Sequence, residues 1–362
     1  MSGLYLILEN GTVFAGESFG AEGEVTGEIV FTTGMTGYLE TLTDPSYHGQ
    51  IVLQTFPLIG NYGVIPADFE SVSGGPKAYI VKTPCQVPSN FRSEGNLGTF
   101  LKEKGIVGLY GIDTRALTRI IREQGVMNGK ITAAPPGEIP PEEIRAYKIQ
   151  NAVQSVSCTV PALYKADQTK YTVALFDFGF KENIKRELLK RNCAVWVLPY
   201  HTPPEEVIRL APDGIMLSNG PGDPAENIAI LENLKVLLQT GIPIFGICLG
   251  HQLLALASGF QTYKLKYGHR GANQPVKNLK TGRIYISSQN HGYAVSQESV
   301  DTGVAEPWFV NVNDRTCEGL WYQQIPAFSV QFHPEGCGGP QDTAFLFDLF
   351  IEKLEGKKYA AG

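Results

Sequence analysis

The chain has 362 residues and a formal net charge of −6 at pH 7, and its composition is 43% hydrophobic and 18% charged. That length accommodates two domains of ordinary size with a large apolar core. The acidic balance argues against binding to nucleic acid, which requires a basic surface, and no apolar run reaches the roughly 18 residues of a membrane-spanning helix. The first residues, MSGLYLILENG, lack the basic flank and long apolar core of a secretion signal. We therefore expect a globular, cytoplasmic protein that contacts neither a membrane nor nucleic acid.

The first 150 residues are rich in short β-like runs separated by glycine and proline turns. The opening run ends at an Asn-Gly pair, which is typical of a tight turn between strands, and EIVFTT and AYIVKTP are further strand-like runs. One helix is clearly indicated in GIDTRALTRIIREQG, where Asp113 can cap the amino end and Gly125 can close the carboxyl end. We predict a β-rich α+β domain over residues 1–150.

Residues 151–170 show no sustained hydrophobic period, and we predict a linker there. From residue 171 to residue 362 the chain changes character, because strand-like and helix-like runs alternate. The strands are YTVALF, CAVWVLP, GIMLS and PIFGI, and the helices that follow them are KENIKRELLKRN, PPEEVIRL, ENIAILENLKVLLQ and HQLLALAS. This alternation predicts an α/β fold with a mostly parallel sheet and helices on both faces. Reactive groups in such sheets gather beyond the carboxyl ends of the strands, here at residues 177–179, 218–224 and 248.

The last of these strand ends reads Gly246-Ile247-Cys248-Leu249-Gly250, the spacing of a nucleophile elbow with sulfur in place of oxygen. A sharp strand-to-helix turn strains the backbone of its central residue, and glycines on either side avoid clashes between Cβ atoms. The turn also places the thiol at a helix amino terminus, where the helix dipole favours a thiolate. We predict that Cys248 is a nucleophile; the alternative is a buried cysteine in a tight turn.

A thiolate needs a proton partner, and SVQFHPEG supplies His333 and Glu335 just after an apolar strand. Residues two apart on a strand share a face, so these side chains can meet if the strand geometry continues past Pro334. The carboxylate would then orient the imidazole, and the imidazole would serve Cys248. The alternative is a histidine that ends a strand beside a solvated glutamate.

The stretch SNGPGDP follows a strand and precedes a helix. It resembles the glycine-rich turn of dinucleotide folds, but no acidic residue ends the next strand, where a ribose ligand is needed. We predict instead that the amides of Gly220 and Leu249 bind a developing oxyanion. The chain contains no Gly-x4-Gly-Lys-[Ser/Thr] motif, so we expect no ATP site on it.

Six cysteines occur without a Cys-x-x-Cys pair, which argues against a disulfide or zinc framework, and we predict no metal site. Among the histidines other than His333, His291 lies in SQNHGYAV, where its neighbours can present polar groups to a ligand. We expect the remaining histidines to be surface or supporting residues; these are His48, His201, His251 and His269.

Four motifs in chain order, GICLGHQ, NGPGDP, QNHG and HPE, resemble those of the class I (triad-type) glutamine amidotransferases. The amino-terminal part, with FTTGMTGYLETLTDPSYHGQIV, PSNFRSEGNLGTFLKEKGI and GIDTRALTR, is similar to the amino-terminal domain of the small subunit of glutamine-dependent carbamoyl-phosphate synthase. The resemblance covers nearly the whole chain. It departs from the family pattern at Cys337, where a small residue such as serine is usual, and at Gln274, where histidine is common.

The resemblance implies a catalytic triad of Cys248, His333 and Glu335. It also implies contacts with glutamine or its oxyanion from Ser46, Gly220, Gly222, Leu249, Gln252, Asn290, Gly292 and Tyr293. Cys337 lies close in sequence to this triad and could be oxidised.

The activity that the resemblance implies is hydrolysis of L-glutamine through a cysteine thioester. Ammonia would pass to a separate large subunit, in a heterodimer or a higher oligomer, for ATP- and bicarbonate-dependent synthesis of carbamoyl phosphate in pyrimidine and arginine biosynthesis. No cofactor is expected on this chain, and ATP and Mg are expected on the large subunit. Two other classes stay open: a stand-alone cysteine hydrolase of the γ-glutamyl hydrolase or peptidase type, and a catalytically silent regulatory subunit.

Overall fold

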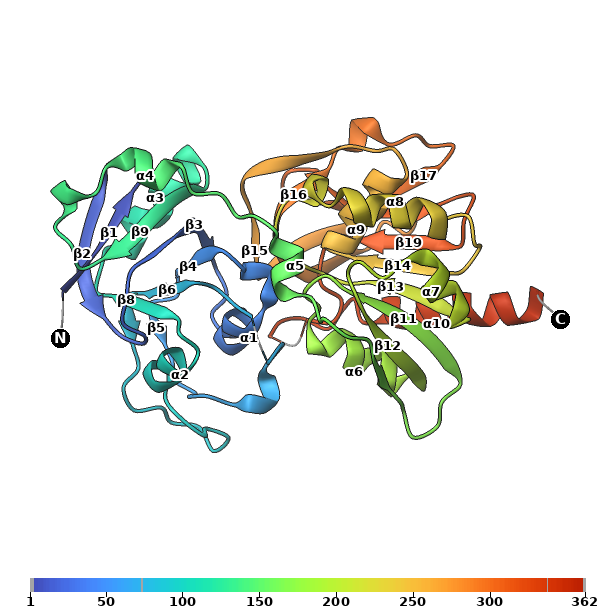
Figure 1. Ribbon diagram of the computed structural model, residues 1–362, viewed down its shortest axis with the longest axis horizontal. Coiled ribbons are helices and arrows are strands. Elements are labelled where there is room, and N and C mark those ends of the chain that lie inside the picture. Colours follow the sequence, from blue (N-terminus) through green and yellow to red (C-terminus); the bar gives the residue numbers. More distant parts are fainter. Residues whose placement is uncertain (1–2, 73, 337, 361–362) are drawn as a thin grey trace. The chain divides into compact units, whose positions relative to one another are not determined.

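The structure is a computed structural model that describes residues 3–72, 74–336 and 338–360, and the chain divides into two compact units (Figure 1). The amino-terminal unit is Met1–Ala152 and the carboxy-terminal unit is Val153–Gly362. The predicted oxidation of Cys337 concerns a residue outside the described part of the chain. No helix among the described residues is both long and apolar enough to cross a membrane.

The amino-terminal unit is built on a closed barrel, with the strand order β1-β2-β8-β6-β4-β3-β9. The first two strands form the predicted hairpin, in which Asn10 accepts a hydrogen bond from the Thr12 amide at 3.0 Å and Gly11 has φ of +86°. This confirms the Asn-Gly turn. The barrel strands are β1 (Gly3–Leu8), β2 (Val13–Ser18), β3 (Val25–Thr32), β4 (Gln50–Gln54), β6 (Ala78–Val81), β8 (Val107–Tyr110) and β9 (Met127–Thr132), and a separate short pair is formed by β5 (Leu58–Ile59) and β7 (Thr83–Pro84).

The helices of this unit pack on the barrel strands through two apolar clusters. The predicted helix is α3 (Thr114–Gln124), in which Asp113 accepts a hydrogen bond from the Ala116 amide at 2.9 Å and Gly125 follows the last turn with φ of +103°. Its apolar side, Leu117 and Ile121, is buried against one cluster. The other cluster contains residues of α1 (Tyr38–Thr43) and α2 (Leu97–Glu103), and α4 (Pro141–Arg145) follows β9.

The carboxy-terminal unit contains one large sheet, in the order β10-β12-β11-β13-β14-β19-β18-β16-β15-β17. Its middle part, β12-β11-β13-β14-β19, is parallel, which confirms the predicted α/β architecture. An antiparallel extension beyond β19 was not expected from the sequence. The strands are β10 (Ala162–Tyr164), β11 (Tyr171–Asp177), β12 (Cys193–Pro199), β13 (Gly214–Leu217), β14 (Ile244–Ile247), β15 (Thr262–Asn278), β16 (Ile284–Val295), β17 (Ala305–Asn311), β18 (Cys317–Tyr322) and β19 (Ala327–Val330).

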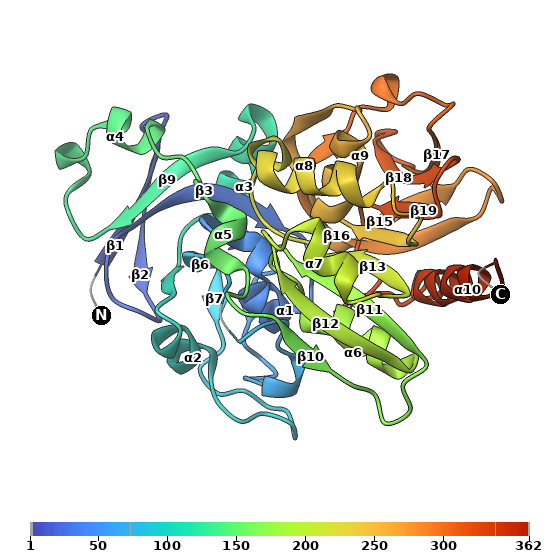
Figure 2. The same cartoon turned by 45° about the vertical axis from the view of Figure 1, so that its right-hand side comes forward.

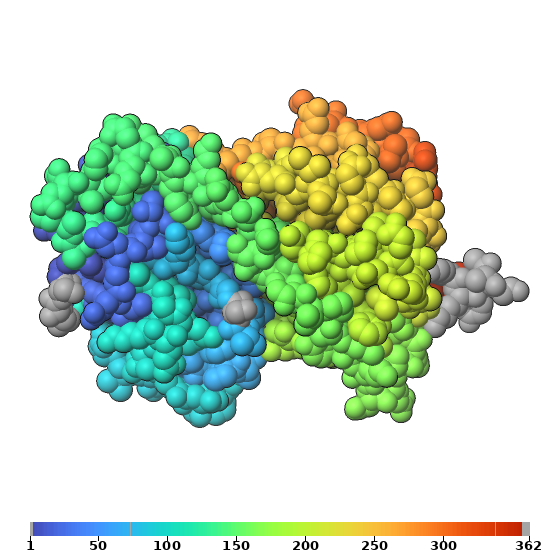
Figure 3. All heavy atoms as spheres, in the orientation of Figure 1, coloured from blue at the N-terminus to red at the C-terminus, as the bar shows by residue number. Residues whose placement is uncertain are grey.

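Helices cover both faces of the parallel part of the sheet (Figures 1 and 2). Both faces need cover because successive residues of a strand point to opposite faces and here both sets are apolar. In β11, Ala174 and Phe176 point to the face covered by α7 (Pro204–Arg209), α8 (Ile228–Leu237) and α9 (Leu249–Ala257). Val173 and Leu175 point to the other face, which is covered by α6 (Glu182–Lys190) and α10 (Phe345–Ala360). The yellow-green and yellow atoms of α7 and α8 form much of the surface of this unit in the space-filling view (Figure 3).

The segment predicted as a linker carries regular structure. It contains α5 (Ala152–Val156) and the strand β10, which pairs antiparallel with β12 at the edge of the sheet. In addition, the Cys158 amide donates a hydrogen bond to Asp177 Oδ2 at 2.7 Å. From Val153 onward the segment therefore belongs to the carboxy-terminal unit. Its structure was not predicted because its own sequence lacks a hydrophobic period. Partners distant in the chain supply its hydrogen bonds.

Candidate active site

Cys248 lies between β14 and α9 in the strained turn that its glycine neighbours predict. Its φ of +52° and ψ of −102° are unusual for a residue with a side chain. A Cβ atom on Gly246 would lie 2.8 Å from the carbonyl oxygen of Gly250, and one on Gly250 would lie 2.3 Å from the carbonyl oxygen of Leu217. Only glycine therefore fits on either side of the cysteine. Strain of this kind persists where the surrounding fold determines it, and it clusters at functional sites.

The sulfur of Cys248 is held on a short, firmly anchored segment. The Cys248 amide donates to the carbonyl of Val330 at 2.9 Å, which ties the turn to β19. The residue caps the amino end of α9, so its side chain lies where the helix dipole stabilises negative charge. Its Sγ lies 3.7 Å from the carbonyl oxygen of Asn290, a thiol donor contact with β16.

His333 and Glu335 meet as predicted, with 2.6 Å between Nδ1 of the imidazole and Oε1 of the carboxylate. The route differs from the expectation, because β19 ends at Val330 and the strand geometry does not continue. Instead the His333 amide donates to the Ser288 carbonyl at 2.9 Å, and the Gly336 amide donates back to the His333 carbonyl at 3.1 Å. A tight turn therefore brings the two side chains together.

The pair is ionised in spite of its burial. Burial lowers the pKa of His333, but the Glu335 carboxylate and the Cys248 thiol outweigh it and raise this pKa to about 10. Burial raises the pKa of Glu335, and the imidazolium more than offsets that effect, so the pKa of this carboxyl lies below its ordinary value. Nε2 of His333 makes no hydrogen bond of ordinary geometry to any described residue. The ring and the thiol lie in the same region, because the His333 amide bonds to Ser288 and the Cys248 sulfur contacts Asn290, two residues further along β16.

Two further residues contact this pair and were not predicted from the sequence. Lys181 Nζ lies 3.8 Å from Glu335 Oε1, and the Asn183 side-chain amide donates to the Glu335 carbonyl. Both follow the strand β11, whose carboxyl end shares an edge of the sheet with that of β14. The sequence feature that could have identified Lys181 and Asn183 is their position just after the end of a parallel strand, where functional groups gather.

The other two strand ends predicted to carry reactive groups, residues 177–179 and 218–224, contain side chains that hydrogen-bond to the backbone of the neighbouring loop. Asp177 Oδ1 accepts hydrogen bonds from the amides of Gly179 and Phe180 at 2.8 and 3.0 Å. Ser218 Oγ accepts from the Phe178 amide at 3.0 Å, and Asn219 Oδ1 accepts from the Lys181 amide at 3.1 Å. These side chains shape the loop that carries Lys181.

Gly220 and Leu249, the predicted oxyanion donors, are neighbours. A Cβ atom on Gly220 would lie 2.1 Å from the Phe178 carbonyl oxygen and 2.8 Å from Leu249 Cδ2, so this position excludes any side chain. Within the described residues, neither the Gly220 amide nor the Leu249 amide donates a hydrogen bond. Gly222 has φ of +87°, a left-handed conformation that favours glycine. Two amides are thus available beside the nucleophilic turn, as oxyanion stabilisation requires.

The predicted glutamine contacts on α9 and β16 are joined to each other. Gln252 Nε2 donates to the Tyr293 carbonyl at 2.8 Å and to Gln331 Oε1 at 2.9 Å, so its side-chain oxygen is the atom that it can offer to a ligand. Asn290 accepts from Cys248, and Gly292 follows two residues later on β16. Ser46 belongs to the amino-terminal unit, where its amide donates to Asp44 Oδ1 at 2.9 Å in a short 3-10 turn. Its contact with glutamine stays a prediction.

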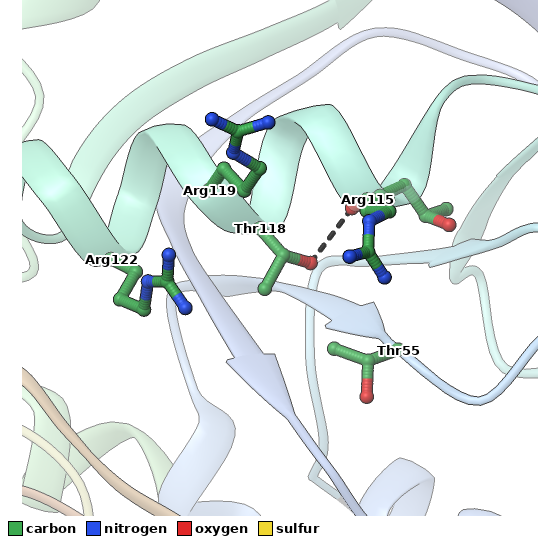
Figure 4. A pocket seen from close by; sticks show the side chains of 6 residues that line it. Thr55, Arg115, Thr118, Arg119 and Arg122 are labelled. Atoms are coloured by element: carbon green, nitrogen blue, oxygen red, sulfur yellow. Dashed lines mark hydrogen bonds between the residues drawn. The ribbon is translucent and has the colours of Figure 1, made fainter.

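A separate cationic hollow lies on the amino-terminal unit, along α3 (Figure 4). Its volume is about 440 Å³, and Arg115, Arg119 and Arg122 line it together with threonine side chains. The hydroxyl of Thr118 donates to the Thr114 carbonyl at 2.7 Å, and no carboxylate lines the hollow. The sequence indicated this helix but not the concave surface beside it.

Comparisons with known proteins agree with the geometry of both units. A family model described as carbamoyl-phosphate synthase small chain, CPSase domain, matches residues 6–131, and one described as glutamine amidotransferase class-I matches residues 174–353. A protein named carbamoyl phosphate synthase small chain from Bacillus cereus is 52% identical over 98% of this chain and 96% of its own length. Proteins of the same name from Fusobacterium nucleatum and Listeria monocytogenes are 51% and 47% identical, over 97% and 98% of this chain and 98% and 97% of their own lengths. The chain belongs to the family of carbamoyl phosphate synthase small chains.

Proposed function

We propose that this chain hydrolyses L-glutamine to glutamate and ammonia and delivers the ammonia to a large subunit that makes carbamoyl phosphate. The observation that carries the proposal is the buried 2.6 Å contact between His333 and Glu335 beside a cysteine in a strained elbow. Membership of the small-chain family supports the same activity. A stand-alone cysteine hydrolase is not favoured, because the family match extends over residues 6–131, which such an enzyme does not need.

The first chemical step is attack of the Cys248 sulfur on the side-chain amide carbon of glutamine. The imidazolium of His333 supplies a positive charge beside the sulfur, and Glu335 keeps that charge in place. The amides of Gly220 and Leu249 stabilise the oxyanion, and removing one donor of this kind typically costs about 100- to 1000-fold in rate. The C–N bond then breaks, His333 gives its proton to the leaving nitrogen, and a γ-glutamyl thioester remains on Cys248.

The second step clears the thioester. His333, now neutral, takes a proton from a water molecule as it attacks the thioester carbon. The C–S bond breaks, glutamate leaves, and the sulfur and the imidazolium return to their starting states. The same imidazole thus acts first as acid and then as base, which is why its orientation by Glu335 matters in both steps.

The large subunit supplies the remaining chemistry in this proposal. ATP and Mg bind there, the two chains form at least a heterodimer in the cytoplasm, and the product serves pyrimidine biosynthesis, arginine biosynthesis or both. The chain itself shows no P-loop motif, which supports an ATP site on another polypeptide.

The experiment that tests the proposal compares glutamine and ammonia as nitrogen donors. Purified chain is mixed with its large subunit, and carbamoyl phosphate is measured with each donor. We expect glutamine-dependent synthesis only when both chains are present, and ammonia-dependent synthesis with the large subunit alone. Glutamine-dependent synthesis by the large subunit without this chain would contradict the assigned role.

We also propose that the arginine-lined hollow on α3 contacts an acidic surface of the large subunit. Arg115, Arg119 and Arg122 are spaced so that they lie on one side of the helix. The only ion pair that the described residues give these arginines is an exposed 3.9 Å contact between Arg119 and Glu123, and exposed pairs of that kind contribute little. A carboxylate-rich partner surface would provide the bidentate acceptors that guanidinium groups favour.

Charge reversal tests this docking surface. In the double variant Arg115→Glu, Arg119→Glu we expect affinity for the large subunit to fall by about 10-fold or more, with glutamine hydrolysis by the isolated chain unchanged. Lys102→Glu, which reverses an exposed charge on α2 in the same unit, is the matched control and should bind normally. Equal affinity of the double variant and the control would exclude the α3 hollow as the contact.

A further inference from the structure

Outside the active site, the carboxy-terminal unit buries a second cluster of titratable groups. It consists of His269 on β15, His291 on β16 and Glu318 on β18, and one ligand-type atom of each lies within 4.8 Å of those of the other two. All three residues are at most 9% exposed. The mechanism above uses none of these groups.

The outer nitrogen of each imidazole already has an acceptor. His269 Nε2 donates to Asp314 Oδ2 at 2.8 Å, and His291 Nδ1 donates to the Tyr293 carbonyl at 2.7 Å. Metal-binding histidines almost always donate their outer N–H to a carboxylate or a backbone carbonyl, which fixes the tautomer and aims the other nitrogen at the ion. The two rings have this arrangement, and their inner nitrogens face the same carboxylate.

The inner atoms are poorly matched as hydrogen-bond partners. His269 Nδ1 lies 3.4 Å from Glu318 Oε1 and has no hydrogen bond of ordinary geometry. His291 Nε2 lies 3.1 Å from Gln289 Oε1 and 4.0 Å from Glu318 Oε1. The Gln289 amide group is directed elsewhere, to Ser287 Oγ and Glu318 Oε2, so an oxygen faces the lone pair of His291.

A proton alone does not remove this conflict. A proton on Nδ1 of His269 can serve Glu318, but it leaves the His291 lone pair opposite Gln289 Oε1. A cation placed among these atoms would be an electron-pair acceptor for all of them at once.

We propose that His269 Nδ1, His291 Nε2 and Glu318 Oε1 bind a divalent transition-metal ion of the Zn²⁺ class, with Gln289 Oε1 as the fourth ligand. Three atoms within 4.8 Å of one another share a point no more than about 2.8 Å from each, and Zn–N and Zn–O distances are about 2.0–2.2 Å, so inward shifts of less than about 1 Å bring the two imidazoles and the carboxylate to ligand distance. Gln289 Oε1 lies 3.1 Å from His291 Nε2, on the same side of the cluster as that ligand. Two imidazoles and a carboxylate are ligands that suit Zn²⁺ and its neighbours better than Ca²⁺ or Mg²⁺.

The surroundings of Glu318 fit a metal ligand as well. Its Oε1 also accepts from Thr316 Oγ1 at 3.1 Å and lies 3.4 Å from Asn311 Nδ2. Such outer donors orient a ligating carboxylate. An ion here would join β15, β16 and β18 next to Asn290, whose carbonyl contacts the nucleophilic sulfur, and would hold that part of β16 in place.

The test measures metal binding directly, and therefore does not depend on the proposed catalytic function. All proteins carry Cys248→Ala, so that the thiol beside His333 cannot take up metal. After treatment with EDTA, each is titrated with Zn²⁺ by calorimetry and with Co²⁺ by visible absorption. We expect one equivalent to bind, with the spectrum of Co²⁺ coordinated by nitrogen and oxygen.

Two variants locate the ion. Glu318→Gln and His269→Gln, each in the Cys248→Ala background, should bind at least about 10-fold more weakly, and circular dichroism checks that each is folded. His201→Gln changes an exposed histidine of the same unit and should bind like the parent. Absence of stoichiometric binding to the parent would overturn the proposal, and so would equal affinity of His269→Gln and His201→Gln.

Discussion

Two imidazole–carboxylate pairs in the carboxy-terminal unit can be compared directly; both imidazoles are buried, but Glu335 is buried whereas the Asp314 side chain is 44% exposed. His333 contacts Glu335 at 2.6 Å, and His269 contacts Asp314 at 2.8 Å with Glu318 at 3.4 Å. In both cases burial lowers the histidine pKa and the carboxylates reverse that effect, so that the pKa is about 10 for His333 and about 9 for His269. The two histidines thus share a raised pKa, although the second pair is open to solvent on the side of Asp314.

The third group distinguishes them. Beside His333 it is the thiol of Cys248, held in a strained turn at the start of a helix. Beside His269 it is the lone pair of His291, on an extended strand. A nucleophile next to the pair leads to acyl transfer, whereas a second imidazole leads to cation binding. A histidine paired with a carboxylate is thus a general device, and its neighbour decides the chemistry.

The largest expected effect comes from removing the third group of the first pair. Cys248→Ala should reduce glutamine hydrolysis by at least about 1000-fold, because no other group can form the thioester. The assay is glutamate release by the chain bound to its large subunit. Ammonia-dependent carbamoyl phosphate synthesis by the same complex is the control and should persist. Substantial glutamate release by the variant would show that the comparison assigns the wrong nucleophile.

Exchanging one carboxylate in each pair sharpens the comparison. Glu335→Gln should lower kcat for glutamine hydrolysis by about 100-fold or more, since the imidazole loses its orientation and its charge partner. Glu318→Gln removes the buried carboxylate beside His269 and should change kcat by less than about 10-fold. Steady-state kinetics of both variants, with thermal unfolding to confirm folding, provide the measurement. Similar losses of kcat would mean that the second pair also acts in the reaction.

The elbow itself can be disturbed without touching a functional side chain. Gly250→Ala would place a Cβ atom 2.3 Å from the Leu217 carbonyl oxygen, so the backbone of the turn must move. We expect a loss of about 1–3 kcal/mol in the free energy of unfolding and a fall in kcat of about 10- to 100-fold from displacement of Cys248. Gly356→Ala, at a helical position with open space around it, is the control and should leave both quantities nearly unchanged.

The smallest expected effect is on the stability of the metal-free protein at alkaline pH. The folded-state pKa values of His333 and His269, about 10 and about 9, lie above the ordinary value of 6.5. Each group therefore contributes stability that is fully present below pH 6.5 and is lost as the pH rises through the folded-state pKa. The free energy of unfolding should fall between pH 7 and pH 10, and urea titrations at intervals across that range would measure it. Glu318→Gln should show a shallower fall, because His269 has lost one of the carboxylates that raise its pKa. An equally steep fall in that variant would contradict the role of Glu318.

Local patterns in the sequence were sufficient for the parallel part of the fold. The strands and helices from Tyr171 to Ser258 were predicted from their periods and turns, as was α3 with its cap at Asp113. The long antiparallel hairpin of β15 and β16 was not predicted, since its two register shifts interrupt the alternation that identifies a strand. The edge strand β10 was missed because it has only three residues.

The active site was partly predictable for the same reason. Cys248 is identified by the glycines two residues before and two residues after it. His333 and Glu335 lie two residues apart, so a local motif contains their contact. Lys181 reaches Glu335 from a different strand end, and no local signal links the two.

The sequence by itself determined which residues carry reactive groups, where the glycines permit a strained turn, and which chemistry the cysteine can perform. Only the tertiary structure decided that His269, His291 and Glu318 converge, because their strands pair through hydrogen bonds between positions far apart in the chain. Backbone strain is a property of neighbouring residues and is therefore visible in the sequence. The mutual approach of buried charges depends on strand register, which the whole sheet sets.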